Sequence, residues 1–165
     1  MIEPNSFVDF LKRKEIDFFC GVPDSLLKEV CFCINEKLDS KFHKITANEG
    51  AAIALAAGYN LATDKVPLVY LQNSGLGNAI NPLLSLCDSS VYKIPMIIMI
   101  GWRGEPGCFD EPQHIKQGAI QEKLLKALEI PYEIIDNQLT NYVPLTDLIL
   151  KSKKESRPVA ILVKK

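Results

Sequence analysis

Apolar stretches with the length of buried strands alternate with amphipathic segments along the chain. In each amphipathic segment large aliphatic and aromatic residues recur at every third or fourth position, the period of a helix that packs by one face. The most apolar stretch, PMIIMIG, carries no charge. The pattern predicts strands over residues 18–22, 42–45, 68–72, 95–101, 132–135 and 157–165, and helices over residues 3–14, 25–38, 49–63, 78–86, 120–128 and 140–152.

Strands that alternate with helices favour a parallel sheet, because each parallel connection needs a crossover that a helix supplies. We therefore expect one α/β domain over residues 1–165 with three layers: a six-stranded, mostly parallel sheet with helices on both faces. In such sheets, ligands bind beyond the carboxyl ends of the strands. The candidate site therefore comprises the segments that follow strands: GVPDS at 21–25, QNSGLGN at 72–78 and GWRGEPGCFDEPQHIKQG at 101–118.

The composition narrows the classes of function. Of 165 residues, 47% are hydrophobic and 24% are charged, which is ordinary for a globular domain. The net charge of −1 provides no basic field for nucleic acid or for an anionic membrane, and no apolar run approaches the roughly 20 residues that span a bilayer. The five cysteines are odd in number and contain no CxxC pair, so we expect reduced thiols in a cytoplasmic protein.

Glu49 stands at the head of a predicted helix, GAAIALAAGYNLA, that has almost no polar residue. An acid in the first turn complements the positive end of a helix, and Asn48 can cap it; on a surface helix this structural role would suffice. A helix that is apolar on all sides is buried instead. We therefore expect the Glu49 carboxyl to be partly desolvated and able to share a proton with a ligand nitrogen.

Two shorter segments have both a structural and a functional interpretation. In SGLGN, glycines between a strand and a helix can bring backbone N–H groups to an anion, but they also suit a tight turn. This segment lacks the residues of the P-loop and the glycine spacing of the dinucleotide fingerprint. In GVPDS, Asp24 or Ser25 would cap the following helix, and the same residues could project from the strand end into the site.

The segment 103–118 is dense in glycine, proline and charge, and we expect it to be a long irregular loop. Arg103 offers a planar fork of donors and Lys116 a point charge, which together suit a small, multiply charged anion. A hard cation is the alternative ligand, with a different set of side chains. Those side chains are Asp110, Glu111 and His114.

Four segments together resemble the pyrimidine-binding, N-terminal domain of thiamine-diphosphate (ThDP) enzymes. They are GVPDS, ANEGAAIALAAGYNLAT, LQNSGLGNAINPL and GWRGEPG…DEPQH…QG, and the resemblance covers nearly the whole chain. Within the family, the last segment is most similar to phosphonopyruvate decarboxylases and next to the α subunits of sulfopyruvate decarboxylases. The resemblance implies ThDP-dependent decarboxylation of a 2-oxo acid, either phosphonopyruvate to phosphonoacetaldehyde and carbon dioxide or, alternatively, sulfopyruvate.

The resemblance also implies a role for particular residues. Glu49 matches the catalytic glutamate that hydrogen-bonds the N1′ nitrogen of the aminopyrimidine ring, and His114 matches a proton donor that acts after carbon dioxide leaves. The residues implied at the cofactor are Glu49, Asn73, Gly75 and Asn78. The residues implied at the substrate are Asp24, Ser25, Arg103 and Lys116, with the two cations at the phosphonate.

The chain departs from the family pattern in one respect. It contains no GDG segment, with which ThDP enzymes hold the diphosphate and Mg²⁺ on a second domain. We therefore expect the chain to bind only the pyrimidine half of the cofactor, to provide no metal ligand and to be inactive alone. Its partner would be a β subunit or a further domain of a longer chain, in a homo- or hetero-oligomer whose assembly buries the helix 49–63.

Two other kinds of function remain open. A non-catalytic nucleotide-binding or regulatory α/β module is supported by SGLGN beside a parallel sheet, but it leaves Glu49 and the charged loop unexplained. A domain that has kept the fold for assembly and has lost catalysis is the other, and the presence of Glu49 argues against it.

Overall fold

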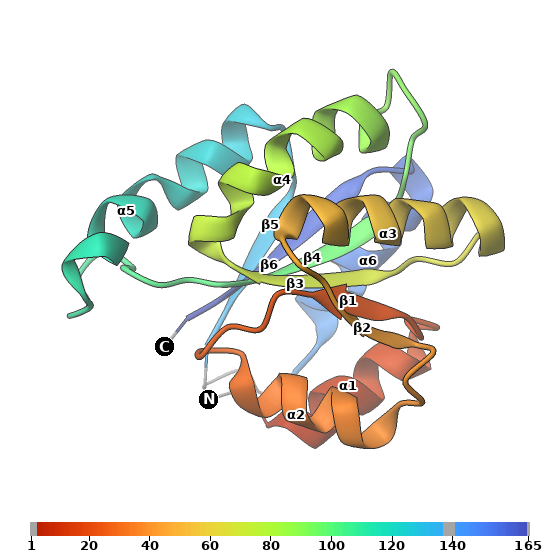
Figure 1. Cartoon of the computed structure of the whole chain (residues 1–165), viewed down its shortest axis with the longest axis horizontal. Helices are drawn as coiled ribbons and strands as arrows, with labels where there is room; N and C mark the ends of the chain where they lie inside the picture. Colours follow the sequence, from red (N-terminus) through yellow and green to blue (C-terminus); the bar gives the residue numbers. More distant parts are fainter. Residues whose placement is uncertain (1–2, 137–140, 165) are drawn as a thin grey trace.

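Six parallel strands form the sheet of this protein, in the order β2-β1-β3-β4-β6-β5. The computed structural model describes residues 3–136 and 141–164 (Figure 1). The strands are β1 (Phe19–Gly21), β2 (His43–Ile45), β3 (Leu68–Gln72), β4 (Met96–Gly101), β5 (Tyr132–Ile135) and β6 (Pro158–Val163). The sheet is entirely parallel, which confirms the predicted class of fold.

Helices cover both faces of the sheet, as predicted (Figure 1). On one face lie α1 (Pro4–Arg13), α2 (Lys28–Lys37) and α6 (Val143–Glu155), which share one apolar core with the sheet. On the other face lie α3 (Glu49–Thr63), α4 (Leu76–Pro82), the π turn Leu83–Cys87 and α5 (Pro112–Ala127), around a second core.

The central strand β4 explains why its sequence is continuously apolar. Ile97 and Met99 point into the core beside α1, α2 and α6, whereas Ile98 and Ile100 point into the core beside α3, α4 and α5. All four side chains are fully buried. A parallel strand with helices on both faces has no solvent-facing side, so it shows no alternation of polar and apolar residues.

The predicted elements lie within a few residues of the observed ones, with two differences that concern the site. The helix expected to begin at Ser25 begins at Lys28, because the Asp24 side chain accepts the Leu26 N–H at 3.0 Å and forms a separate turn. Neither Asp24 nor Ser25 is therefore the helix cap. The predicted helix 140–152 corresponds to α6; residue 140 lies outside the described part of the chain, as does residue 165 of the last predicted strand.

The second difference is that the expected loop 103–118 is irregular only as far as Glu111. Helix α5 starts at Pro112, whose fixed φ angle suits the first position of a helix. The first turns of α5 carry exposed or half-exposed side chains and show no apolar period that would have revealed them.

Helix α3 has the predicted bounds, but it is not buried on all sides within this chain. Small and aliphatic residues make up its outer face, which is exposed: Ala51, Ala54, Leu55, Gly58 and Leu61. No helix in the described residues is long and apolar enough to cross a membrane.

Candidate cofactor and substrate site

The Glu49 carboxylate lies where the amino-terminal ends of α3 and α4 meet. Asn48 caps α3 by accepting the Ala51 N–H at 2.8 Å, so Glu49 occupies the first turn and is half-buried. Asn78 Nδ2 donates to Glu49 Oε2 at 2.8 Å. A Cβ atom on Gly75 would lie 2.2 Å from Glu49 Oε1, so the carboxylate rests against a position that only glycine leaves open.

One oxygen of Glu49 is held and the other is available. Within residues 3–136 and 141–164 no protein group donates a hydrogen bond to Oε1. A half-buried acceptor at the head of a helix suits the protonated ring nitrogen of a heterocycle, because partial desolvation strengthens a single hydrogen bond. Glu49, Gly75 and Asn78, which the resemblance assigns to the cofactor, are therefore neighbours, and their arrangement fits the pyrimidine end of ThDP.

Asn73, the fourth residue assigned to the cofactor, makes its side-chain hydrogen bonds to the main chain of Arg103. Its side chain is buried, donates to the Arg103 carbonyl at 2.8 Å and accepts the Arg103 N–H at 3.1 Å. Both polar ends of the amide thus join the end of β3 to the end of β4. Asn73 consequently sets the position of the Arg103 main chain.

The Arg103 side chain is held at its guanidinium group. Nη1 donates to Ser25 Oγ at 2.8 Å, and Nε and Nη2 donate to the two Asp110 oxygens at 2.8 and 2.5 Å. Asp110 also accepts the N–H groups of Gly104 and Glu111, each at 2.8 Å. The hydrogen bonds from Arg103 hold the pKa of Asp110 far below the ordinary carboxyl value. The sequence did not indicate this pairing.

The alternative that Asp110, Glu111 and His114 bind a hard cation is not supported. Both Asp110 oxygens already accept hydrogen bonds from Arg103 and from the main chain. In the part of the chain that the structure describes, no three acidic, histidine or cysteine side chains are close enough to hold a metal ion.

Asp24 lies on the opposite face of the sheet from Glu49. It is 5% exposed, and its Oδ2 sits so close to Gly101 that a Cβ there would come within 2.1 Å. Asp24 Oδ1 is buried and has no hydrogen-bond partner among the described residues. Burial raises the pKa of this carboxyl above its ordinary value, because desolvation disfavours the charged form.

A cavity of about 420 Å³ opens beside Asp24 and Ser25, between α2 and the strands β2 and β3. His43 Nε2 and the Tyr70 hydroxyl lie 2.8 Å apart on its wall. Burial lowers the pKa of His43 and raises that of Tyr70. Sequence reasoning missed this pair, because the two residues belong to separate strands and no local motif contains both.

His114 and Lys116 lie on the first turns of α5, at the end of the helix that projects beyond the sheet (Figure 1). His114 is half-exposed and Lys116 is exposed. The main chain of His114 packs on Gly104, where a Cβ would lie 2.0 Å from the His114 carbonyl oxygen. No described hydrogen bond or ion pair joins either side chain to Glu49 or Arg103.

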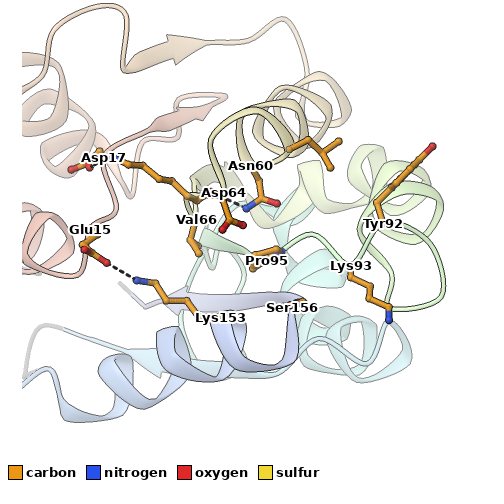
Figure 2. Close-up of a pocket in the computed structure, with 12 residues that line it drawn as sticks. Glu15, Asp17, Asn60, Asp64, Val66, Tyr92, Lys93, Pro95, Lys153 and Ser156 are labelled. Atoms are coloured by element: carbon orange, nitrogen blue, oxygen red, sulfur yellow. Dashed lines mark hydrogen bonds and ion pairs between the residues drawn. The ribbon is translucent and has the colours of Figure 1, made fainter.

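Another cavity, of about 660 Å³, lies at the edge of the sheet where the strands begin (Figure 2). Two ion pairs of 3.2 Å, Lys153–Glu15 and Lys65–Asp17, are formed by residues of its wall. None of the residues predicted for the site lines it. It lies at the amino ends of the strands, whereas ligands of parallel sheets bind at the carboxyl ends.

A parallel α/β domain that presents a hydrogen-bonded glutamate at the head of a small-residue helix is typical of the cofactor-binding domains of ThDP enzymes. Residues 4–128 match the family described as "Thiamine pyrophosphate enzyme, N-terminal TPP binding domain". The chain belongs to this family, as the resemblance predicted.

Within this family, the chain is similar to two kinds of decarboxylase. It is 36% identical over 148 residues to the sulfopyruvate decarboxylase subunit alpha of Methanococcus maripaludis, covering 90% of this chain and 86% of the relative. It is 37% identical over 115 residues to the phosphonopyruvate decarboxylase of Streptomyces viridochromogenes, covering 70% of this chain but 28% of the relative. Both are decarboxylases, which agrees with the predicted class of enzyme.

A solved structure shares the fold. The crystal structure of benzoylformate decarboxylase from Polynucleobacter necessarius superposes with a TM-score of 0.61 over 95% of this chain and 28% of that chain. At 19% identity the likeness concerns the fold alone.

Proposed function

We propose that this chain is the pyrimidine-binding part of a ThDP-dependent decarboxylase that acts on a 2-oxo acid with a second anionic group. The observation that carries the proposal is the Glu49 carboxylate at the carboxyl edge of the sheet: Oε2 accepts a hydrogen bond from Asn78, and Oε1 accepts none from the described residues. A regulatory nucleotide-binding module would not require an acid oriented in this way.

The residues of this chain would hold and activate the cofactor. Bound ThDP supplies the electron sink that lets a 2-oxo acid lose carbon dioxide. Glu49 Oε1 would share a proton with the pyrimidine ring nitrogen, while Asn78 keeps the other oxygen from turning away. Gly75 leaves room for the carboxylate to take this position, and a half-buried setting makes the contact stronger than it would be in water.

The substrate would lie near the ends of β1 and β4. Ser25 and Arg103 are hydrogen-bonded there, and Asp24 is buried beside them. We assign Arg103 and Lys116 to the second anionic group of the substrate and His114 to proton donation after carbon dioxide leaves.

Two substrates are candidates, and each combines a 2-oxo acid with a second anion. Phosphonopyruvate, which would yield phosphonoacetaldehyde and carbon dioxide in phosphonate biosynthesis, is the one implied by the charged segment after β4. Sulfopyruvate is the alternative, and the match over 86% of the length of a sulfopyruvate decarboxylase subunit alpha favours it. The phosphonopyruvate decarboxylase of Streptomyces viridochromogenes is matched over 28% of its length.

A partner would complete the enzyme. The relative from Methanococcus maripaludis is named a subunit alpha, so we assign the diphosphate and Mg²⁺ to a β subunit or a further domain. The outer face of α3 would lie against such a partner, since Leu55 and Leu61 are 40% and 63% exposed. The five free cysteines fit the cytoplasm as the location.

The test is a comparison of kcat/KM for phosphonopyruvate and sulfopyruvate with the complete assembly, ThDP and Mg²⁺. We expect decarboxylation of at least one acid and its near-complete loss in Glu49→Gln. Binding of AMP or NAD that does not depend on Glu49, without any decarboxylation, would support the regulatory module instead.

A further inference from the structure

We propose that Asp110 is a positioning residue that sets the direction of the Arg103 guanidinium group, so that its remaining N–H donors face the second anionic group of the substrate. The inference rests on the proposed function, since it concerns the same site. The inference gives a role to the Asp110 side chain, for which the sequence motif and the chemistry of the cofactor imply none.

The first observation is the geometry of the pair. Arg103 Nε and Nη2 donate to different Asp110 oxygens, at 2.8 and 2.5 Å, so the contact is a two-point contact between planar groups. Such a contact defines the plane and the direction of the guanidinium, which a single hydrogen bond cannot do. The Asp110 side chain is 8% exposed, so water does not compete effectively for it.

The second observation is that Asp110 is itself held. Its carboxylate accepts the N–H of Gly104 and the N–H of Glu111, both at 2.8 Å, in addition to the two contacts from Arg103. Gly104 adopts a φ of +67°, a conformation that favours glycine and brings its N–H to the carboxylate within the loop. The loop that carries Asp110 is thus folded around this side chain.

The third observation concerns the donors that are left. Arg103 has five N–H donors, and Ser25 and Asp110 occupy three of them. One donor on each Nη atom has no acceptor within the described residues. The Arg103 side chain is 25% exposed, and the Ser25 contact places it at the strand ends where the substrate is proposed to bind.

The charge of the pair limits the size of the effect. Asp110 neutralises much of the Arg103 charge, so the pair attracts an anion less strongly than a free arginine would. The pair therefore acts through the direction of its hydrogen bonds. Two fixed N–H donors can bind the oxygens of a phosphonate or sulfonate, whereas they form no hydrogen bond with the methyl group of pyruvate. Loss of the fixed orientation of Arg103 should therefore weaken the binding of 2-oxo acids that carry a second anionic group, and it should leave the binding of pyruvate unchanged.

The decisive variant is Asp110→Asn in the complete assembly. Asparagine has nearly the same shape but turns one acceptor into a donor that opposes the Arg103 N–H. We expect kcat/KM for the preferred substrate to fall at least tenfold, mainly through KM, while kcat/KM for pyruvate changes less than about threefold. The dissociation constant of 3-phosphonopropionate, which lacks the reactive ketone, should rise at least tenfold by calorimetry.

Two variants serve as controls. Glu111→Gln removes a neighbouring negative charge but keeps every hydrogen bond of Arg103. It therefore distinguishes the effect of local charge on binding from the effect of the orientation of the guanidinium group. Asp9→Asn makes the same chemical change in an ion pair with Lys37, at 2.7 Å, on α1. Both should bind 3-phosphonopropionate within about twofold of the unchanged assembly.

The outcomes separate the two proposals. Unchanged binding of 3-phosphonopropionate in Asp110→Asn, or equal losses for pyruvate and the preferred substrate, would overturn the role of Asp110 and leave the proposed function standing. An assembly that decarboxylates neither acid would overturn the proposed function, while analogue binding would still decide on Asp110. If Asp110→Asn does not assemble, Asp110→Glu keeps the charge and displaces the carboxylate; unchanged analogue binding there would equally overturn the role.

Discussion

The Asn78 amide donates a hydrogen bond of 2.8 Å to Glu49 Oε2, across 29 positions of sequence. Glu49 lies in the first turn of α3 and Asn78 in the first turn of α4. Their side chains meet because the two helices pack closely through small residues. A Cβ atom on Gly50 would lie 2.8 Å from the Asn78 carbonyl oxygen, which shows how near the two backbones approach. The direction of the Glu49 carboxylate is thus a property of this helix pair.

Replacement of Glu49 by glutamine should abolish activation of the cofactor. The amide keeps the shape of the side chain but cannot share a proton in the same way, and we expect the exchange rate of the thiazolium C2–H to fall about a hundredfold or more. The measurement is deuterium exchange by NMR in the complete assembly with ThDP and Mg²⁺. An exchange rate that stays within a few-fold would exclude Glu49 as the activating acid.

Gly75→Ala should displace the Glu49 carboxylate by crowding its Oε1 atom. The new Cβ would lie 2.2 Å from Oε1 of a flexible side chain, so we expect the Glu49 carboxylate to move and the fold to persist. A displacement of this size should lower the C2–H exchange rate tenfold or more.

Gly77→Ala is the matched control, because a Cβ at that position meets nothing within 4 Å. Alanine should stabilise this exposed helical position by about 0.5–1 kcal/mol and leave the exchange rate unchanged. Equal exchange rates in the two alanine variants would contradict the role assigned to the close approach at Gly75.

Asp24→Asn should make the stability of the protein less dependent on pH. Burial raises the folded-state pKa of Asp24, so the wild-type stability from this group is present below the unfolded value of about 4 and is lost as pH rises towards the folded value. Asparagine resembles the neutral acid, and we expect the variant to be more stable at pH 7 by about 1 kcal/mol or more.

The difference in unfolding free energy between wild type and Asp24→Asn should vanish below about pH 4, where both side chains are neutral. Urea unfolding at several pH values measures it. A wild type that is as stable as the variant at pH 7 would show that the unpaired Oδ1 carries no cost.

His114→Ala should lower kcat and leave cofactor binding intact. His114 is half-exposed on α5 and has no described contact with Glu49, so we expect the dissociation constant of ThDP to stay within about twofold. Loss of a general acid should reduce kcat about a hundredfold. Gln113→Ala, one residue earlier on the same helix, is the control and should keep full activity; an equal loss of ThDP affinity in His114→Ala would argue against the assignment.

Cys108 should react with a thiol reagent much faster than the other cysteines. It is exposed in the loop before α5, whereas burial raises the pKa of Cys20, Cys31 and Cys87 to about 12. A colorimetric disulfide reagent should reveal one fast thiol in the native chain. Cys108→Ser should remove that fast phase, and a fast phase that survives would place the reactive thiol elsewhere.

The helix that carries Glu49 was predicted with its observed bounds, whereas the contact of Glu49 with the cofactor stays a prediction. Glu49 and the bounds of α3 follow from the capping residue and the run of small and aliphatic residues, which are coded within one segment. The start of α5 at Pro112 was missed because its first turns have no buried face of their own. The outer face of α3 is exposed in the single chain, and its burial by a partner stays a prediction, since composition does not tell which side of a helix another molecule covers.

By itself the sequence determined the order of strands and helices, the parallel sheet and the candidate edge, because hydrophobic period and helix capping act over a few residues. Tertiary structure alone decided that Asn73 holds the Arg103 main chain and that Asp110 holds the Arg103 side chain. Those contacts depend on the strand order, which brings the ends of β1, β3 and β4 together, and on a loop that folds back on itself. Such proximity arises from packing of the whole sheet and has no counterpart in the spacing of residues along the chain.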